Sequence, residues 1–167
     1  MSLENDGYQF ENAEHSFELL IHKQLGHFQP FFELNEYTVS VQEFSEMRSN
    51  NAVAKVKITV GSQIESVSAE GDGPVTALDI AIRKALARFY PQIREVKLID
   101  YQVRVLDSDK ATAAKVRVLI QSTDQNTNWT TIGVSTDIIN ASWRAMLDAI
   151  EYKLLQDSQL AKRMAVA

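Results

Sequence analysis

The segment Gly71-Asp72-Gly73-Pro74 is the place in this sequence where ligand chemistry is easiest to build, because it lies between an expected strand and an expected helix. Two glycines without Cβ atoms let a backbone approach a ligand closely. Pro74 fits the first helical position, where its missing N–H costs nothing. The following helix would direct unpaired N–H groups and the positive end of its dipole outward, which suits a carboxylate. A plain turn with a helix cap explains the same letters, so both interpretations stay open here.

A second junction, Val134-Ser135-Thr136-Asp137-Ile138, also leads into a helix N-terminus and favours the ligand interpretation. Two such openings would offer N–H groups to a carboxylate, and carbonyls together with Asp72 would suit an ammonium group. A strand between the junctions would add apolar side chains for an aliphatic tail, and a branched-chain amino acid has these three parts. The strand residues are Leu98, Tyr101, Val103 and Val105. Tyr101 fits equally well as an ordinary strand aromatic with its hydroxyl at the surface.

Signs of catalysis or metal binding are scarce. The three histidines, His15, His22 and His27, all precede the strands, so a Ser-His-Asp arrangement within the body of the fold is hard to build. His15 and His22 are seven residues apart but have no placed carboxylate beside them, which makes a poor zinc site. Cysteine is absent and no phosphate-binding Gly-Lys-Ser/Thr loop occurs. We expect no catalytic residue and no metal ligand in this chain.

Composition narrows the classes of partner. The 167 residues carry 22 acidic against 17 basic side chains, a net charge of −5, which argues against nonspecific nucleic-acid binding. A strand-rich unit followed by a helix superficially resembles double-stranded RNA-binding domains, but those place basic residues where this chain has Asp72 and Asp137. No apolar run approaches the ~20 residues of a membrane span. With no leader and no cysteine, the expectation is a cytoplasmic protein without a membrane partner.

Hydrophobic periodicity predicts a doubled architecture. A helix over residues 12–25 is followed by strands near 34–44, 54–60 and 64–69 and a helix from 74 to 89. The same order returns as strands 96–105, 114–120 and 129–134 and a helix over 138–156. The letters of 54–60 match those of 114–120, an offset of 60 that grows to 64 at Ala77 and Ala141. The fold class expected is therefore α+β, with two pseudo-symmetric βββα repeats packed together behind an N-terminal linker helix.

Several motifs resemble the C-terminal regulatory domain of the 2-isopropylmalate synthase family, and most closely its citramalate synthase members. The resemblance rests on 100–106 (DYQVRVL), 111–118 (ATAAKVRV), 131–135 (TIGVS) and 141–143 (ASW). The opening segments 6–10 and 16–20 resemble the linker that follows the catalytic barrel in that family. This resemblance divides the chain into a linker helix segment at 4–29, a regulatory amino-acid-binding domain at 30–156 and a tail at 157–167. The two repeats would occupy 30–91 and 95–156.

The family resemblance also implies a function. Whole enzymes of this type condense acetyl-CoA with a 2-oxo acid on a metal-dependent barrel; neither barrel nor cofactor would belong to these residues, which should be inactive alone. The regulatory domain would form a homodimer and bind isoleucine, or in the second place leucine, near the dimer interface for feedback inhibition. The effector contacts implied by motif are Gly71, Asp72, Gly73, Val75, Thr76, Leu98, Tyr101, Val105, Val134 and Thr136. Thr136 replaces a proline common in the family. The alternative is a dimerisation module that binds no effector.

Overall fold

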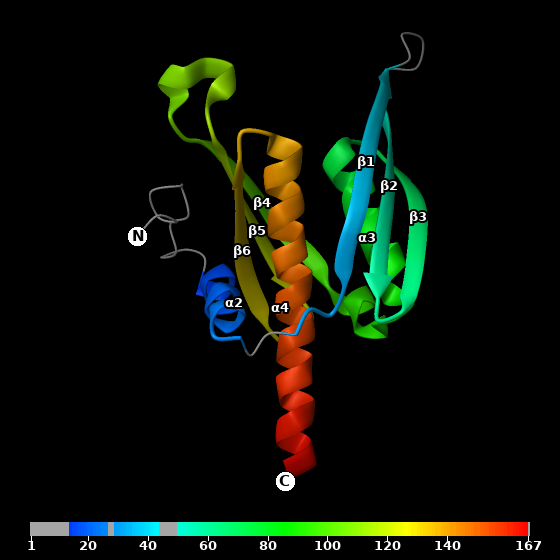
Figure 1. Cartoon of the computed structure of the whole chain (residues 1–167). Coiled ribbons are helices and arrows are strands. Elements are labelled where there is room, and N and C mark those ends of the chain that lie inside the picture. Colours follow the sequence, from blue (N-terminus) through cyan, green and yellow to red (C-terminus); the bar gives the residue numbers. More distant parts are fainter. Residues whose placement is uncertain (1–13, 27–28, 44–49, 167) are drawn as a thin grey trace. The chain divides into compact units, whose positions relative to one another are not determined.

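The computed structural model describes all residues except 1–13, 27–28, 44–49 and 167, and it confirms the α+β fold class (Figure 1). Two βββα units follow a helix, α2 (Glu14–Gln24). The chain forms two compact units: residues 30–94 make the first, and the described parts of 1–29 and 95–167 make the second.

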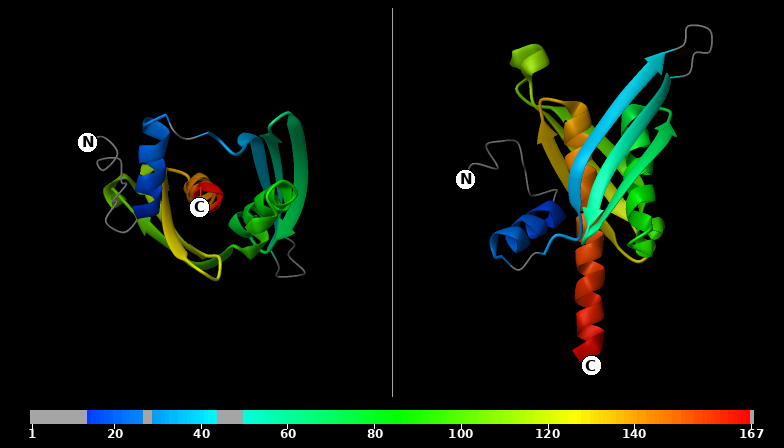
Figure 2. Two further views of the ribbon diagram at one scale, coloured as in Figure 1. Left: turned by 90° about the horizontal axis from the view of Figure 1, so that it is seen from below. Right: turned by 45° about the vertical axis from the view of Figure 1, so that its right-hand side comes forward.

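The first unit is an antiparallel sheet of three strands with a helix on one face. Its strands are β1 (Glu33–Glu43), β2 (Asn50–Val60) and β3 (Gln63–Gly71), in that order, and its helix is α3 (Pro74–Ala87). Alternate residues of the central strand β2 point toward α3 and are buried, as period-two patterning predicts. A short 3-10 helix, η2 (Pro91–Glu95), leads out of this unit. Figure 2 shows α3 lying along one face of its sheet.

The second unit repeats this plan and adds two features. Its sheet contains β4 (Lys97–Val105), β5 (Val116–Thr123) and β6 (Asn128–Ser135), with a 3-10 segment η3 (Ser108–Ala113) between β4 and β5. Helix α4 (Ile138–Val166) covers one face, and α2 packs beside β6 (Figure 1). We expected the last helix to end near residue 156, but α4 continues to Val166, and its final turns extend past the strands (Figure 1).

Strand registers relate the two repeats by a constant offset of 64 residues. Ala52 pairs with Gly71 in the first sheet and Val116 with Ser135 in the second, and the helices begin at Pro74 and Ile138. The β-bulges fall between Leu34 and Glu36 and between Leu98 and Asp100, again 64 residues apart. The expected match of 54–60 with 114–120 is therefore wrong by four residues. A shift of four keeps every side chain on the same face of a strand, so alternation could not detect the error.

The two sheets differ in how their last strands are covered. Ile132 and Val134 point to the face of β6 opposite α4, and they are only 1% and 5% exposed. The residues 64 positions earlier on β3 are Ser68 and Glu70, and both are exposed. At these positions β6 is thus buried on both faces and β3 on one, and among the described elements α2 packs on β6.

Candidate functional site

The junction between β3 and α3 leaves the first turn of its helix without a side-chain cap. Gly73 is the N-cap residue, with extended backbone angles (φ −159°, ψ 171°) and no side chain to accept a hydrogen bond. Its carbonyl accepts the first helical bond from Ala77 N at 3.0 Å. Pro74 has no N–H, so the amides of Val75 and Thr76 are the donors that this turn directs outward. The five predicted residues of this junction thus lie together at an open helix N-terminus.

The two glycines of this junction serve different structural purposes. A Cβ on Gly71 would lie 2.7 Å from Ala77 N, so this position brings the strand close to the helix. A Cβ on Gly73 would meet nothing within 4 Å, so the space in front of the amides of α3 is open. Asp72 between them is exposed. The arrangement provides two amide donors with a carboxylate in the adjoining turn, which suits a ligand with both a carboxylate and an ammonium group.

The second junction is closed by its own side chains. Asp137 Oδ1 accepts a hydrogen bond from Ile139 N at 2.8 Å, and Ser135 Oγ accepts one from Asp137 N at 3.1 Å. Asp137 is therefore an N-cap with a carboxylate already at the dipole of α4. A second carboxylate there would be repelled, so this helix N-terminus differs from that of α3. Thr136 is exposed beside it.

The Tyr101 hydroxyl is engaged within the second unit. It lies 2.7 Å from Ser142 Oγ, and Ser142 donates its own proton to Ile138 O at 2.7 Å. Because a serine hydroxyl has one proton, Tyr101 must be the donor in the first contact. The chain of bonds attaches β4 to the first turn of α4. Tyr101 thus lies beside the second junction, as expected, while its hydroxyl serves as an anchor.

The apolar residues predicted on β4 share the α4 side of the sheet. Tyr101 pairs with the buried Ile120, and Leu98 pairs with the buried Ser122, which fixes the face. Leu98 is 37% and Val105 54% exposed, so α4 leaves the strip only half covered. Val134 points to the opposite face of the same sheet, and its carbonyl accepts a bond from Arg144. The structure therefore groups Leu98, Tyr101 and Val105 and separates Val134 from them.

A sequence model of the LeuA allosteric (dimerisation) domain matches residues 11–154. The chain belongs to this family. It is 48% identical over 158 residues to the (R)-citramalate synthase of Geobacter sulfurreducens, covering 95% of this chain and 30% of that protein. The (R)-citramalate synthase of Aquifex aeolicus is 44% identical over 157 residues, with 94% and 30% covered. The 2-isopropylmalate synthase of Aquifex aeolicus is 29% identical over 142 residues, with 83% and 26% covered. The resemblance drawn from the motifs is confirmed, and the chain spans about 30% of the length of the citramalate synthases.

The LeuA-type domain also contains a buried ion pair that the sequence analysis missed. Lys153 Nζ on α4 lies 2.6 Å from Asp124 Oδ2 and 3.1 Å from Asp157 Oδ1, and its side chain is 6% exposed. Asp124 also accepts bonds from Asn126 N and from Thr127 N and Oγ1. Burial opposes ionisation of Asp124, but the Lys153 bond and the turn amides outweigh it and lower its pKa to about 2. The cluster attaches the β5–β6 turn to α4. A lysine on the apolar face of a predicted helix was the available signal.

The sequence analysis also missed that Tyr37 on β1 is the equivalent of Tyr101 on β4. It pairs with Val56 as Tyr101 pairs with Ile120, at the equivalent position 64 residues earlier. The offset of 60 derived from the letters hid this correspondence.

In the described part of this LeuA-type domain, no group of three or more metal-ligating side chains comes together. None of its described helices is long and apolar enough to span a membrane. The expected absence of catalysis and the cytoplasmic location stay predictions.

Proposed function

We propose that this chain is the regulatory and dimerisation domain of an acetyl-CoA-dependent synthase of the citramalate or 2-isopropylmalate type. In this proposal it works as part of a longer chain that carries the catalytic barrel, forms a homodimer, and binds a branched-chain amino acid for feedback inhibition. Membership of the LeuA family and the citramalate synthases among its relatives support the assignment. Identity of 44–48% to citramalate synthases, against 29% to an isopropylmalate synthase, favours isoleucine over leucine.

One observation carries the binding proposal: the uncapped N-terminus of α3 at Gly73. The effector carboxylate is assigned to the amides of Val75 and Thr76, and its ammonium group to Asp72. Helix α4 offers a comparison within the same chain, because Asp137 already supplies a carboxylate to its amides. At the junction of the first repeat no side chain caps the helix, and the amides of Val75 and Thr76 are assigned to the ligand.

Replacing Gly73 with aspartate tests this assignment directly. The new side chain enters open space and would cap α3 as Asp137 caps α4, so the fold should be kept while the carboxylate site is filled. Gly73→Ala is the matched control, because it adds a Cβ without a carboxylate.

The measurement is a thermal unfolding titration with isoleucine, leucine and valine. At ~100 times Kd the ligand should stabilise the wild type by about 2.7 kcal/mol. We expect the same response in Gly73→Ala and none in Gly73→Asp. No shift with any of the three amino acids in the wild type contradicts effector binding, and an equal shift in all three proteins contradicts the site.

The second candidate, dimerisation without an effector, is favoured by one feature of the second repeat. The Tyr101 hydroxyl, an expected effector contact, is already bonded to Ser142 within the fold, and Ser142 is bonded to Ile138 O. Light scattering on Tyr101→Phe, combined with the titration, separates the two functions. If the wild type is a dimer that responds to none of the amino acids, the structural role stands. If it responds, and Tyr101→Phe responds equally, the hydroxyl is an anchor and not an effector contact.

A further inference from the structure

The sheet of the second unit has two edge strands, β4 and β6, and helix α2 closes the edge of β6. The backbone N–H of Thr130 donates to His15 Nδ1 on α2 at 2.8 Å. That of Ile132 donates to Ser16 Oγ on the same helix at 2.9 Å. Leu19 of α2 is buried, with 1% of its surface exposed. The outward N–H groups of β6 are thus satisfied by α2 in place of a neighbouring strand.

At the other edge, hydrogen bonding fixes which groups of β4 point away from β5. The N–H of Leu106, the residue after the last one of β4, donates to Lys115 O at 2.7 Å. Hydrogen-bonded and non-hydrogen-bonded pairs alternate along two antiparallel strands. Counting back from Leu106, the N–H and C=O groups of Tyr101, Val103 and Val105 therefore point away from β5 and toward the edge of the sheet.

Only the second half of this edge is open. The N–H of Tyr101 donates to Asp100 Oδ1 at 2.9 Å, and a β-bulge lies between Leu98 and Asp100. Both features protect the first half of the strand against pairing. Within the described part of the chain, the outward N–H groups of Val103 and Val105 form no hydrogen bond. Their side chains are 41% and 54% exposed, so the open part of the edge is also apolar.

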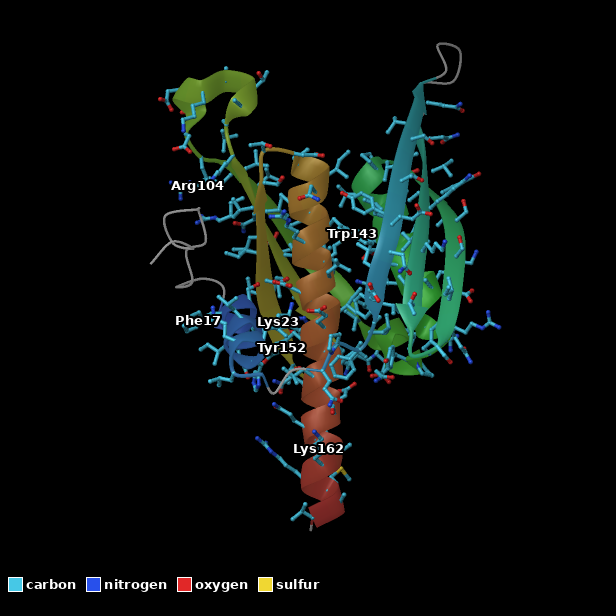
Figure 3. All side chains as sticks on the ribbon, in the orientation of Figure 1. Phe17, Lys23, Arg104, Trp143, Tyr152 and Lys162 are labelled. Carbon is cyan, nitrogen blue, oxygen red and sulfur yellow. The ribbon has the colours of Figure 1, made fainter. Side chains whose placement is uncertain are left out.

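Charge distinguishes β4 from the edge strands of the first unit. Those strands are β1 and β3, and both carry glutamates and no basic side chain, so two copies of either strand would repel each other. Strand β4 carries both signs, with Lys97, Asp100 and Arg104. Figure 3 shows Arg104 pointing away from α4, so this charge lies on the face opposite the exposed valines. A second copy of β4 therefore fits this edge if its register keeps like charges apart.

One antiparallel register meets this condition. A two-fold axis at Arg104 would place the two Arg104 side chains directly opposite each other, which is destabilising. An axis at Gln102 would place Val105 opposite the β-bulge. An axis at Val103 places Arg104 opposite Gln102 of the second copy, and Val105 opposite Tyr101, a β-branched side chain beside an aromatic one. With this axis the strand is complementary to itself, as the interface of a two-fold dimer requires.

We propose that two copies of this chain join through β4, with the strands antiparallel about an axis at Val103, so that the two sheets become one continuous sheet. The N–H of Val103 donates to Val103 O of the second copy, and the N–H of Val105 donates to Tyr101 O of the second copy. Each bond occurs twice by symmetry, and the N–H of Tyr101 stays with Asp100 Oδ1. The inference rests on the homodimer of the proposed function and locates its contact.

Replacing Val103 with proline tests the contact by light scattering. Proline removes an N–H that the sheet itself does not use, so the unit should stay folded, which tryptophan fluorescence checks. Val39→Pro is the matched control, because Val39 is the equivalent residue on β1, 64 positions earlier. We expect a dimer for the wild type and Val39→Pro and a monomer for Val103→Pro. A dimeric Val103→Pro, or a monomeric Val39→Pro, would overturn the proposal, whereas a monomeric wild type would contradict the homodimer itself.

Hydrogen exchange in the wild type tests the same contact without a substitution. The amides of Val103 and Val105 should be protected only in the dimer. Well above Kd the monomer fraction varies as the inverse square root of concentration, so a hundredfold dilution should lower their protection about tenfold. The amide of Gln102 faces β5 and should not change. Protection of the two valines that is independent of dilution would mean that another segment of the chain covers the edge, and no protection in a dimeric sample would place the interface elsewhere; either result overturns the proposal.

Discussion

Replacing Gly133 with alanine tests the contact that sets the distance between β6 and α4. A Cβ at this position would lie 2.0 Å from Ala141 O and 2.9 Å from Ala145 N, both backbone atoms of α4. Side-chain Cβ atoms essentially never approach closer than 3.0 Å, so helix and strand must separate by about the difference between 2.0 and 3.0 Å. No rotamer change can relieve this overlap, because neither partner is a side chain.

The magnitude follows from two opposing effects. Overpacking of a core costs ~1–3 kcal/mol, and a rigid backbone partner places this case at the upper end. Loss of unfolded-state freedom on changing glycine to alanine returns ~0.4–1 kcal/mol. We therefore expect Gly133→Ala to lower the free energy of unfolding by about 2–2.6 kcal/mol. Gly73→Ala places its Cβ in open space and should be neutral or slightly stabilising. In Gly71→Ala the Cβ would lie 2.7 Å from Ala77 N, so its loss of unfolding free energy should fall between those of the other two variants.

Urea unfolding can assign these effects to a unit. Both tryptophans, Trp129 and Trp143, belong to the second unit, so their fluorescence reports the unit that contains Gly133. At a slope of ~2 kcal/mol per M, a loss of about 2–2.6 kcal/mol lowers the midpoint by about 1–1.3 M. Circular dichroism follows both units, so a change in it that the fluorescence does not share reports the first unit, where Gly71 and Gly73 lie. A fluorescence midpoint for Gly133→Ala within error of the wild type would refute the close approach of β6 and α4.

Two further predictions concern the second unit and use the same urea assay. Ala111 has φ 52° and ψ −119°, a region that favours glycine, so Ala111→Gly should raise the free energy of unfolding by about 1–2 kcal/mol; a lower midpoint would contradict the strained geometry. Asp124→Asn leaves Lys153 with Asp157 as its acidic partner and should cost ~3 kcal/mol near neutral pH. Because folding lowers the pKa of Asp124 from 3.8 to about 2, its contribution is present above pH 3.8 and lost as the pH falls through about 2, where wild type and variant should converge. A cost that stays constant down to pH 2 would contradict this.

The order of strands and helices could be predicted because each element has a strong period. The alternation in β2 and the apolar stripe of α3 agree with the burial that the structure shows. The end of α4 was missed although the signal was present: residues 157–166 contain neither proline nor glycine and are rich in helix-forming types. Burial stops near Leu155, and the helix continues because nothing ends it.

The candidate site was predictable where its chemistry is local. An open N-terminus at Gly73 follows from a Gly-Pro sequence, and the cap at Asp137 is a preference that the letters also contain. The Tyr101–Ser142 bond joins residues 41 positions apart, and the Lys153–Asp124 pair joins residues 29 apart. Which polar groups meet over such separations depends on how α4 is positioned over its sheet. Patterning fixes the face that a residue occupies but not its partner on that face.

The repeats share their register, yet their surfaces differ in a way that separates their roles. At equivalent positions β3 has Ser68 and Glu70, where β6 has the buried Ile132 and Val134. A polar outer face cannot hold a helix that docks by a single buried leucine, so a helix equivalent to α2 could not pack on β3 as it does on β6. The helix N-termini differ in the opposite direction. The N-terminus of α3 has no side-chain cap, whereas that of α4 is capped by Asp137. In the proposed function, ligand recognition therefore belongs to the first repeat, and the helix that leads into the domain is held by the second.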